Sequence, residues 1–236
     1  MPRSNLSRLL VGAALTALVG VGAVTPASAA TTPPVITWQS QIAAGATYAF
    51  GEVPAVVPTC TAVDDLGAVP CSVTGYSTEV GTHVLTATAV SLDGLFTATE
   101  TRSYTVAAWE LKGFYRPVKM GAGVWNKVKG GATVPLKFKV YVDGDKSRSA
   151  AVVASLTAQQ VTCDATAAPI GAPVPITSAK KGFQLKYRDG AFHQNWKTTK
   201  VAKAKPAKKA PATTVCQQVT LTTQDGSTLT ALFTLR

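Results

Sequence analysis

The chain has 236 residues and carries 23 Lys and Arg against 12 Asp and Glu, for a formal net charge of +11. Beyond the first 29 residues no apolar run is long enough to span a membrane, so an integral membrane protein is not expected. The remaining length is sufficient for two domains that each bury a core.

Residues 1–29 have the pattern of a secretory signal peptide. Arg3 and Arg8 supply positive charge around the start of an uncharged apolar stretch at 9–24, and small residues at 27–29 form a cleavage pattern. We therefore expect cleavage before Ala30 and a secreted, extracellular protein whose cysteines are oxidised. A signal that stays uncleaved and anchors the chain is the alternative.

The charge is divided unevenly along the rest of the chain. Residues 30–108 hold six acidic residues and one basic residue, for a net charge of −5. Residues 109–236 hold twenty basic and six acidic residues, for a net charge of +14. This shift in composition predicts two domains, 30–107 and 108–236.

The first domain has the pattern of a β-sandwich. Residues 82–90 and 97–106 alternate with period two, and Asp93-Gly94 between them predicts a hairpin turn. Another turn is expected at 64–67. Asp64 and Asp65 in that turn suggest either a weak calcium site or a capped turn, and we favour the capped turn because adjacent carboxylates point apart on an extended chain.

Four stretches of the first domain resemble the immunoglobulin-like bacterial surface modules related to the hyalin-repeat family. They are CTAVD at 60–64, CSVTGY at 71–76, VGTHVLTATA at 80–89 and YTV at 104–106. The resemblance implies a seven-strand sandwich that serves as a spacer or adhesion repeat.

The second domain is also rich in predicted strands. In the segment 132–142, Val134, Leu136, Phe138 and Val140 face one way, while Pro135, Lys137, Lys139 and Tyr141 face the other. Further strands are expected at 113–115, 183–187, 192–196, 215–223 and 228–235, with a hairpin turn at 225–227. Residues 150–160 fit a helix or a strand equally well.

Five blocks of the second domain resemble the PxKF-domain family of secreted actinobacterial proteins. They are GFYRPV at 113–118, NKVKGG at 126–131, VPLKF at 134–138, FHQNWKT at 192–198 and DGSTLTALF at 225–233. The resemblance implies a β domain at the end of exported surface proteins, with no established catalysis. The fold class expected for the whole chain is therefore all-β, with two tandem immunoglobulin-like β-sandwich domains after the signal peptide.

The chain departs from the PxKF pattern at 197–214, where a lysine-, alanine- and proline-rich stretch replaces a short turn. It contains six lysines and no acid: Lys197, Lys200, Lys203, Lys205, Lys208 and Lys209. We expect a mobile surface loop that binds anionic polymers, with a solvated linker as the alternative. Lys127, Lys129, Lys137 and Lys139 are further candidates for contact with an anionic partner.

The four cysteines allow three pairings in principle. Pairing within each domain, Cys60 with Cys71 and Cys163 with Cys216, is the most economical. A zinc site is the rival interpretation, but the spacing is not that of a metal site and His83 and His193 are the only histidines. We therefore expect two disulfides, no metal and no cofactor.

No constellation of residues predicts catalysis, because His193 lacks an accompanying nucleophile and orienting acid. Most of the aromatic residues of the second domain are expected in the core. The aromatic residues considered are Trp109, Phe114, Tyr115, Trp125, Tyr187 and Trp196. Trp125 is the best candidate for exposure.

The sequence favours a secreted, non-enzymatic cell-envelope or adhesion-type protein whose basic second domain contacts an anionic wall polymer or polysaccharide. One alternative is a carbohydrate-binding module that uses exposed aromatics. A purely structural spacer and an enzyme of unrecognised type are the others. Sequence-specific nucleic-acid binding is not expected, since no base-reading element accompanies the lysines.

Overall fold

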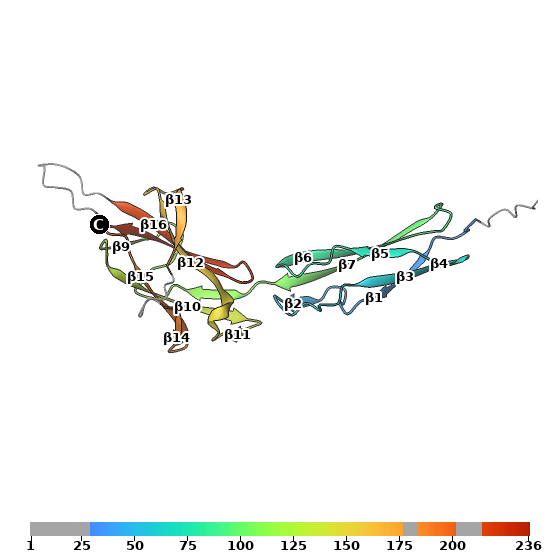
Figure 1. Ribbon diagram of the computed structural model, residues 1–236, viewed down its shortest axis with the longest axis horizontal. Helices are drawn as coiled ribbons and strands as arrows, with labels where there is room; N and C mark the ends of the chain where they lie inside the picture. The colour runs from blue at the N-terminus through green and yellow to red at the C-terminus, as the bar shows by residue number, and fades with distance from the viewer. Residues whose placement is uncertain (1–28, 177–183, 202–213) are drawn as a thin grey trace, which may run out of the picture.

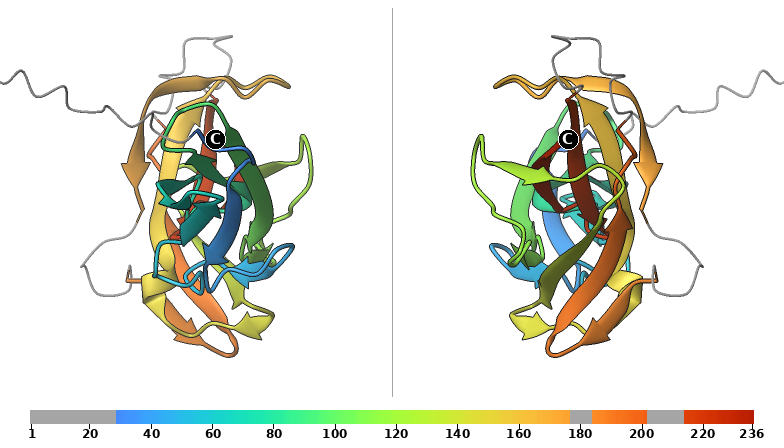
Figure 2. Two further views of the ribbon diagram at one scale, coloured as in Figure 1. Left: turned by 90° about the vertical axis from the view of Figure 1, so that its right-hand side faces the viewer. Right: turned by 90° about the vertical axis from the view of Figure 1, so that its left-hand side faces the viewer.

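The computed structural model describes residues 29–176, 184–201 and 214–236. These residues form β-strands and one 3-10 turn, η1 (Ala150–Val152), and no α-helix occurs among them. The strands form two groups, β1–β7 and β8–β17, that lie end to end along the long axis (Figure 1). Seen along that axis, the two groups overlap (Figure 2). The expected all-β class with two sandwiches is confirmed.

No helix within the described ranges has the length and apolar character to cross a membrane. The predicted signal peptide falls on residues 1–28, which lie outside the described part of the chain, and on Ala29.

The first sandwich packs a three-stranded sheet, in the order β1-β3-β4, against a four-stranded sheet, β2-β7-β6-β5. Its strands are β1 (Val35–Gln39), β2 (Thr47–Ala49), β3 (Thr59–Asp64), β4 (Gly67–Val69), β5 (Cys71–Thr74), β6 (Gly81–Val90) and β7 (Thr97–Ala107). Seven strands is also the number that the immunoglobulin-like resemblance implies.

The predicted hairpin is the longest strand pair of this sandwich. Ten residue pairs run in register from Gly81 opposite Val106 to Val90 opposite Thr97. Gly94 has a φ of +73° in the turn, which glycine adopts without steric cost. The prediction of both strands and of their turn is confirmed.

The core of the first sandwich consists mainly of small and aliphatic side chains, with one large aromatic residue. Tyr104 is 1% exposed, and its hydroxyl donates to the Ser77 carbonyl at 2.6 Å and accepts from the Ser77 amide at 2.8 Å. A buried phenol needs such partners, because an unpaired hydroxyl in an apolar core is costly. The Tyr104 hydroxyl therefore ties β7 to the segment that precedes β6.

The second sandwich packs β11-β10-β15-β14, with β8 also paired to β10, against β13-β12-β16-β17-β9. The strands are β8 (Glu110–Gly113), β9 (Trp125–Val128), β10 (Thr133–Val142), β11 (Asp145–Lys146), β12 (Val153–Val161), β13 (Pro169–Pro175), β14 (Lys186–Arg188), β15 (Ala191–Lys197), β16 (Val215–Thr223) and β17 (Thr228–Leu235). In each sandwich an early strand runs parallel to the last one, β2 beside β7 and β9 beside β17.

Three details of the second sandwich differ from the sequence prediction. The strand expected at 113–115 is instead β8, which ends at Gly113, where a φ of +126° turns the chain and Phe114 is buried in the core. The strand expected at 183–187 is β14, centred two residues later. The ambiguous segment 150–160 is resolved in favour of a strand, β12, preceded by the short η1 turn.

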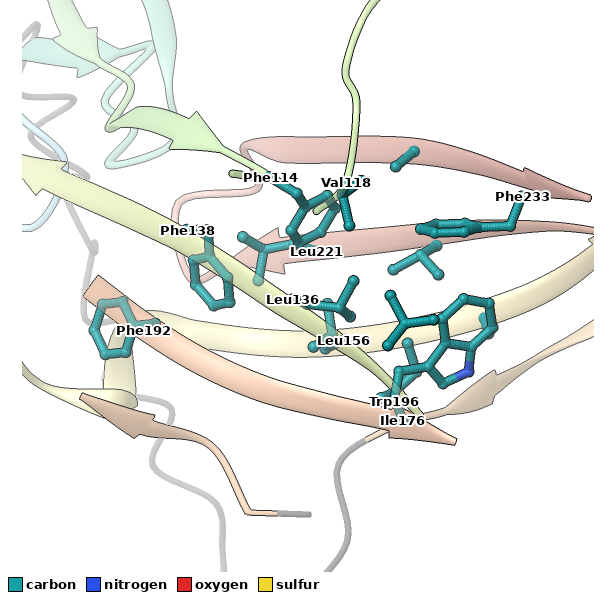
Figure 3. Packing of buried hydrophobic residues seen from close by; sticks show 14 of the residues in the cluster. Phe114, Val118, Leu136, Phe138, Leu156, Ile176, Phe192, Trp196, Leu221 and Phe233 are labelled. Atoms are coloured by element: carbon teal, nitrogen blue, oxygen red, sulfur yellow. The ribbon is translucent and has the colours of Figure 1, made fainter. Parts of the chain in front are cut away.

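Aromatic side chains from both sheets fill the second core (Figure 3). Phe138 stacks on Phe192 with ring centroids 5.3 Å apart, and Phe114 meets Phe138 edge to face at 6.1 Å. Trp196 contacts Phe233 of the opposite sheet at 4.9 Å. The buried side of β10 consists of the four residues predicted to face inward.

The two sandwiches share no sheet and no core cluster within the described residues, and β7 ends at Ala107 only three residues before β8 begins. Trp109 lies between them. Its ring packs against the core of the second sandwich and meets Phe50 of the first edge to face, with centroids 5.6 Å apart. One indole therefore contacts both domains.

Candidate functional site

The outer side of β10 carries the residues predicted to face away from the core: Pro135, Lys137, Lys139 and Tyr141. All four are half-buried, since their stems pack on the neighbouring strands of the same sheet. Lys139 lies opposite Lys112 of β8. The structure thus places the two lysines predicted on this strand on one face.

Two strands that are distant in sequence extend this face. Lys137 is opposite His193 of β15, and His193 is opposite Lys186 of β14, so the three residues form one row across three strands. Directly opposed residues in antiparallel strands have Cβ atoms about 5 Å apart. The basic face is defined here as the outer side of β8, β10, β14 and β15, with Lys112, Lys137, Lys139, Lys186, Arg188 and Lys197.

Little negative charge accompanies the basic face. Lys112 forms a salt bridge with Glu110 at 3.0 Å, and both side chains are about half-exposed. In the described part of the chain, no carboxylate lies within 4 Å of the charged groups of Lys137, Lys186 or Arg188. The positive charge of this face is therefore available to an external anion.

Two tyrosines on this face lie beneath lysine ammonium groups. The Lys112 Nζ atom is 4.6 Å from the Tyr141 ring centroid, and the Lys139 Nζ atom is 5.2 Å from that of Tyr115. Both distances are within the range of cation–π attraction. Tyr115 is 36% exposed whereas the adjacent Phe114 is buried, so Tyr115 is an exception to the prediction that most aromatic residues of the second domain lie in the core.

His193 of the basic face has a pKa below the usual value for histidine. Burial lowers its pKa, and repulsion by the nearby Arg188 and Lys137 lowers it further. A hydrogen bond with the Arg188 backbone and the charge of Asp189 act in the opposite direction. The imidazole is therefore mainly neutral at pH 7.

A groove lies where β9 and the start of β10 approach each other in the same sandwich. This groove has a volume of about 680 Å³, and its lining includes Trp125, Lys127 and Lys129 from β9 and the segment after it, Lys119, and Pro135 at the start of β10. Trp125 is half-buried rather than fully exposed. Lys127 and Lys129 thus accompany the predicted aromatic candidate, in a groove that meets the outer side of β10 at Pro135.

The wall of this groove is held by one buried amide. The Asn126 side chain accepts from the Lys119 amide at 2.8 Å and donates to the Lys119 carbonyl at 2.9 Å and to the Leu232 carbonyl at 3.1 Å. These bonds fix β9 against the chain segment that precedes it.

The first residues of the predicted lysine loop belong to the sandwich. Lys197 ends β15, and Thr198 is buried, with its hydroxyl bonded to the Lys129 and Ala132 carbonyls at 3.2 and 3.0 Å. Lys200 is exposed, and Val201 packs against the core. Residues 197–201 are therefore part of the sandwich, because Thr198 and Val201 have polar and apolar partners there. Lys203, Lys205, Lys208 and Lys209 lie outside the described residues.

Both expected disulfides are present. Cys60 of β3 is bonded to Cys71 of β5, which joins the two sheets of the first sandwich. Cys163 is bonded to Cys216 of β16. Asp64 caps its turn by accepting from the amides of Leu66 and Gly67 at 2.9 and 3.1 Å, as the capped-turn interpretation requires.

No protein family matches this chain, and no curated protein is similar to it in sequence. Among solved structures it is similar to the fibronectin(III)-like modules of Clostridium thermocellum CbhA, at 13% identity and a TM-score of 0.25 over 85% of this chain and 93% of that one. Titin A168–169 has 11% identity and a TM-score of 0.25, with 86% and 84% covered. Three N-terminal domains of the bacteriophage RB49 outer capsid protein Hoc have 12% and 0.28, with 86% and 70% covered.

Proposed function

We propose that this chain is a secreted, non-enzymatic cell-envelope or adhesion-type protein that holds anionic extracellular polymers on the basic face of its second sandwich. The observation that carries the proposal is the row Lys137–His193–Lys186, in which three strands bring two lysines to the two sides of an imidazole, and neither lysine forms a salt bridge within the described residues. Two disulfides and the secretory pattern of residues 1–29 support an oxidising, extracellular location.

The polymer is recognised by its charge. Lysine and arginine side chains on one sheet release condensed counterions from a polyanion, so affinity falls steeply as the salt concentration rises. The acidic first sandwich, with a net charge of −5 over residues 30–108, serves as a spacer that does not compete for the same polymer. The PxKF resemblance supports the same role in an exported surface protein.

Retention of the secreted chain on dextran sulfate, with uncharged dextran as the control, tests the proposal. We expect the logarithm of the binding constant to fall linearly with the logarithm of the salt concentration. The double variant Lys137→Gln/Lys186→Gln should lose at least about tenfold in affinity at low salt, by analogy with other phosphate-type contacts. The matched variant Lys127→Gln/Lys129→Gln removes the same charge from the groove and should lose less.

Equal loss in the two double variants would refute the basic face, because binding would then follow net charge alone. Replacing the other five lysines of the predicted loop by glutamine tests the loop separately, because Lys197 belongs to the basic face. They are Lys200, Lys203, Lys205, Lys208 and Lys209, of which the last four lie outside the described residues. Unchanged retention in that variant would remove the loop from the binding surface.

The groove supports a second candidate, a carbohydrate-binding module. A half-buried tryptophan in a groove of about 680 Å³ is an arrangement on which a sugar ring can stack. This function predicts binding to neutral glycans that is insensitive to salt and is lost in Trp125→Ala. Salt-sensitive binding that survives Trp125→Ala would exclude it.

A further inference from the structure

A small hollow lined by polar and charged residues lies within the basic face. Its volume is about 170 Å³, and it is lined by Gln184, Lys186, Arg188, His193 and Asn195. It forms where β14 and β15 pair, with Lys186 opposite His193. Arg188 lies two residues after Lys186 and Asn195 two residues after His193, so both point to the same face of the sheet. The hollow presents two cations, an imidazole and two amides, with no apolar side chain among its lining residues.

The charges around His193 are repulsive before any ligand binds. Arg188 and Lys186 approach from β14, Lys137 flanks the ring from β10, and Asp189 in the turn is the nearby acid. Arg188 and Lys186 are exposed and form no salt bridge among the described residues. An anion placed between them would relieve this repulsion and would favour the protonated imidazole.

We propose that the hollow binds one tetrahedral oxyanion, a phosphate or sulfate group, and that His193 takes up a proton as the anion enters. The arginine supplies a planar fork of N–H donors, the lysine a point charge, and the imidazolium a third cationic donor. The size of the hollow suits one such group rather than a row of sugar rings. The inference rests on the proposed function in that the group belongs to the anionic polymer.

Binding and protonation are reciprocal. If the anion favours protonated His193, protonation must strengthen anion binding by the same factor. The site therefore holds its ligand more tightly in acidic surroundings, between about pH 5 and pH 8, where histidine titrates.

Titration of the secreted chain with sodium sulfate tests the inference, because sulfate keeps its double charge across this pH range whereas phosphate does not. Calorimetry should give at least about fivefold tighter binding at about pH 5.5 than at about pH 8. In parallel, the NMR signal of the His193 ring should show that sulfate raises the imidazole pKa. If the unmodified protein shows no tighter binding at the lower pH, or no rise of the His193 pKa with sulfate, the proposal is overturned.

Three variants locate the site. His193→Gln should keep the binding seen at about pH 8 and lose the pH dependence, and Arg188→Gln, at an exposed position, should weaken binding about tenfold at both pH values. Lys127→Gln makes the same charge change in the other groove and should have no effect. Equal weakening by Lys127→Gln and Arg188→Gln, or unaltered pH dependence in His193→Gln, would contradict the inference. If His193→Gln does not fold, Arg188→Gln and the His193 titration still decide it.

Dextran sulfate and free sulfate distinguish a polymer substituent from a free ion. Displacement of the polymer by free sulfate, with the same pH dependence, supports a polymer-borne group. Sulfate binding without polymer binding supports the hollow as a site for the free ion and refutes the proposed function. Polymer binding with no response of His193 to sulfate refutes the hollow and leaves the proposed function in place.

Discussion

The backbone amide of Trp109 donates a hydrogen bond of 2.7 Å to the Oδ2 atom of Asp225, a residue 116 positions later in the chain. Asp225 is 7% exposed and also accepts from the Thr223 hydroxyl and the Ser227 hydroxyl, each at 2.6 Å. The β16–β17 turn of the second sandwich therefore holds the linker whose indole ring contacts Phe50 of the first. One carboxylate fixes the joint between the domains.

Asp225→Ala should loosen this joint and destabilise the second sandwich. The change removes both carboxylate oxygens and takes this acceptor from the Trp109 amide and from the amide and hydroxyl of Ser227, at a cost of about 2 to 3 kcal/mol. Urea unfolding measures the loss, and small-angle scattering measures the wider range of interdomain orientations. Asp145→Ala, at an exposed position in β11, is the control and should change neither.

The joint should also weaken in acid. Although burial opposes it, hydrogen bonds from Ser227, Thr223 and Trp109 lower the pKa of Asp225. A carboxyl group whose folded pKa is depressed stabilises the fold above its unfolded pKa, near 4, and this contribution is lost as the pH falls through the folded pKa. Unfolding measured from about pH 6 down to about pH 2 should show the loss in the unmodified protein and a smaller loss in Asp225→Asn. Identical pH profiles would contradict this role of Asp225.

Tyr104→Phe should destabilise the first sandwich by about 1 to 2 kcal/mol, because the half-buried Ser77 amide and carbonyl both lose the hydroxyl that pairs with them. Tyr48→Phe provides a matched control, since the Tyr48 hydroxyl makes only long contacts of 3.3 and 3.5 Å near the surface. Chemical unfolding of the two variants should separate them. An equal effect would mean that the phenol hydroxyl of Tyr104 contributes no more to stability than that of the half-buried Tyr48.

Gly113→Ala should be far more costly than Gly144→Ala, although both glycines have positive φ values, +126° and +79°. A Cβ atom at Gly113 would lie 2.8 Å from the Lys137 carbonyl oxygen and 3.1 Å from the Phe138 Cα, whereas Gly144 has open space around it. We expect about 1 kcal/mol for Gly144→Ala, from backbone strain alone, and at least about 3 kcal/mol for Gly113→Ala. Thermal unfolding checks the order, and similar values would show that β8 moves away from β10 at little cost.

Reduction of the disulfides should destabilise each sandwich separately. The bonded cysteines are 11 and 53 residues apart, so in the chain-entropy model the bridges contribute about 3 and about 4 kcal/mol. Cys60→Ser/Cys71→Ser should lower the stability of the first sandwich only, and Cys163→Ser/Cys216→Ser that of the second. Mass spectrometry of the native protein should show a gain of four hydrogens on reduction, and a protein with free native thiols would not show it.

Patterns between neighbouring residues predicted the strand faces and the hairpin turn of the first sandwich. The alternation of 134–141 identified the inward and outward sides of β10, and Asp93-Gly94 identified the hairpin that joins β6 to β7. The neighbours of β10 could not be read in this way. Lys186 and Arg188 lie in a local hairpin with β15, whose turn holds Asp189 and Gly190 at positive φ. They reach the basic face because β15 pairs with β10, a segment about 60 residues earlier in the chain.

Burial of polar groups was the other feature that the sequence concealed. Asp225 stands in a segment, 225–227, with the composition of an ordinary hairpin turn, and its partner Trp109 lies in a different part of the chain. Thr198 likewise stands in a lysine-rich stretch typical of a loop, yet its hydroxyl is bonded to two carbonyls of the sandwich. Both residues are fixed by acceptors or donors that only the folded chain brings together.

The parallel pairing of β2 with β7 and of β9 with β17 has a mechanical consequence. When tension is applied along the long axis of the molecule, parallel strands tend to slide past each other, and their cross-strand bonds are then strained together instead of opening one after another. Both sandwiches should therefore resist unfolding by tension more strongly than a sheet whose hydrogen bonds open in sequence.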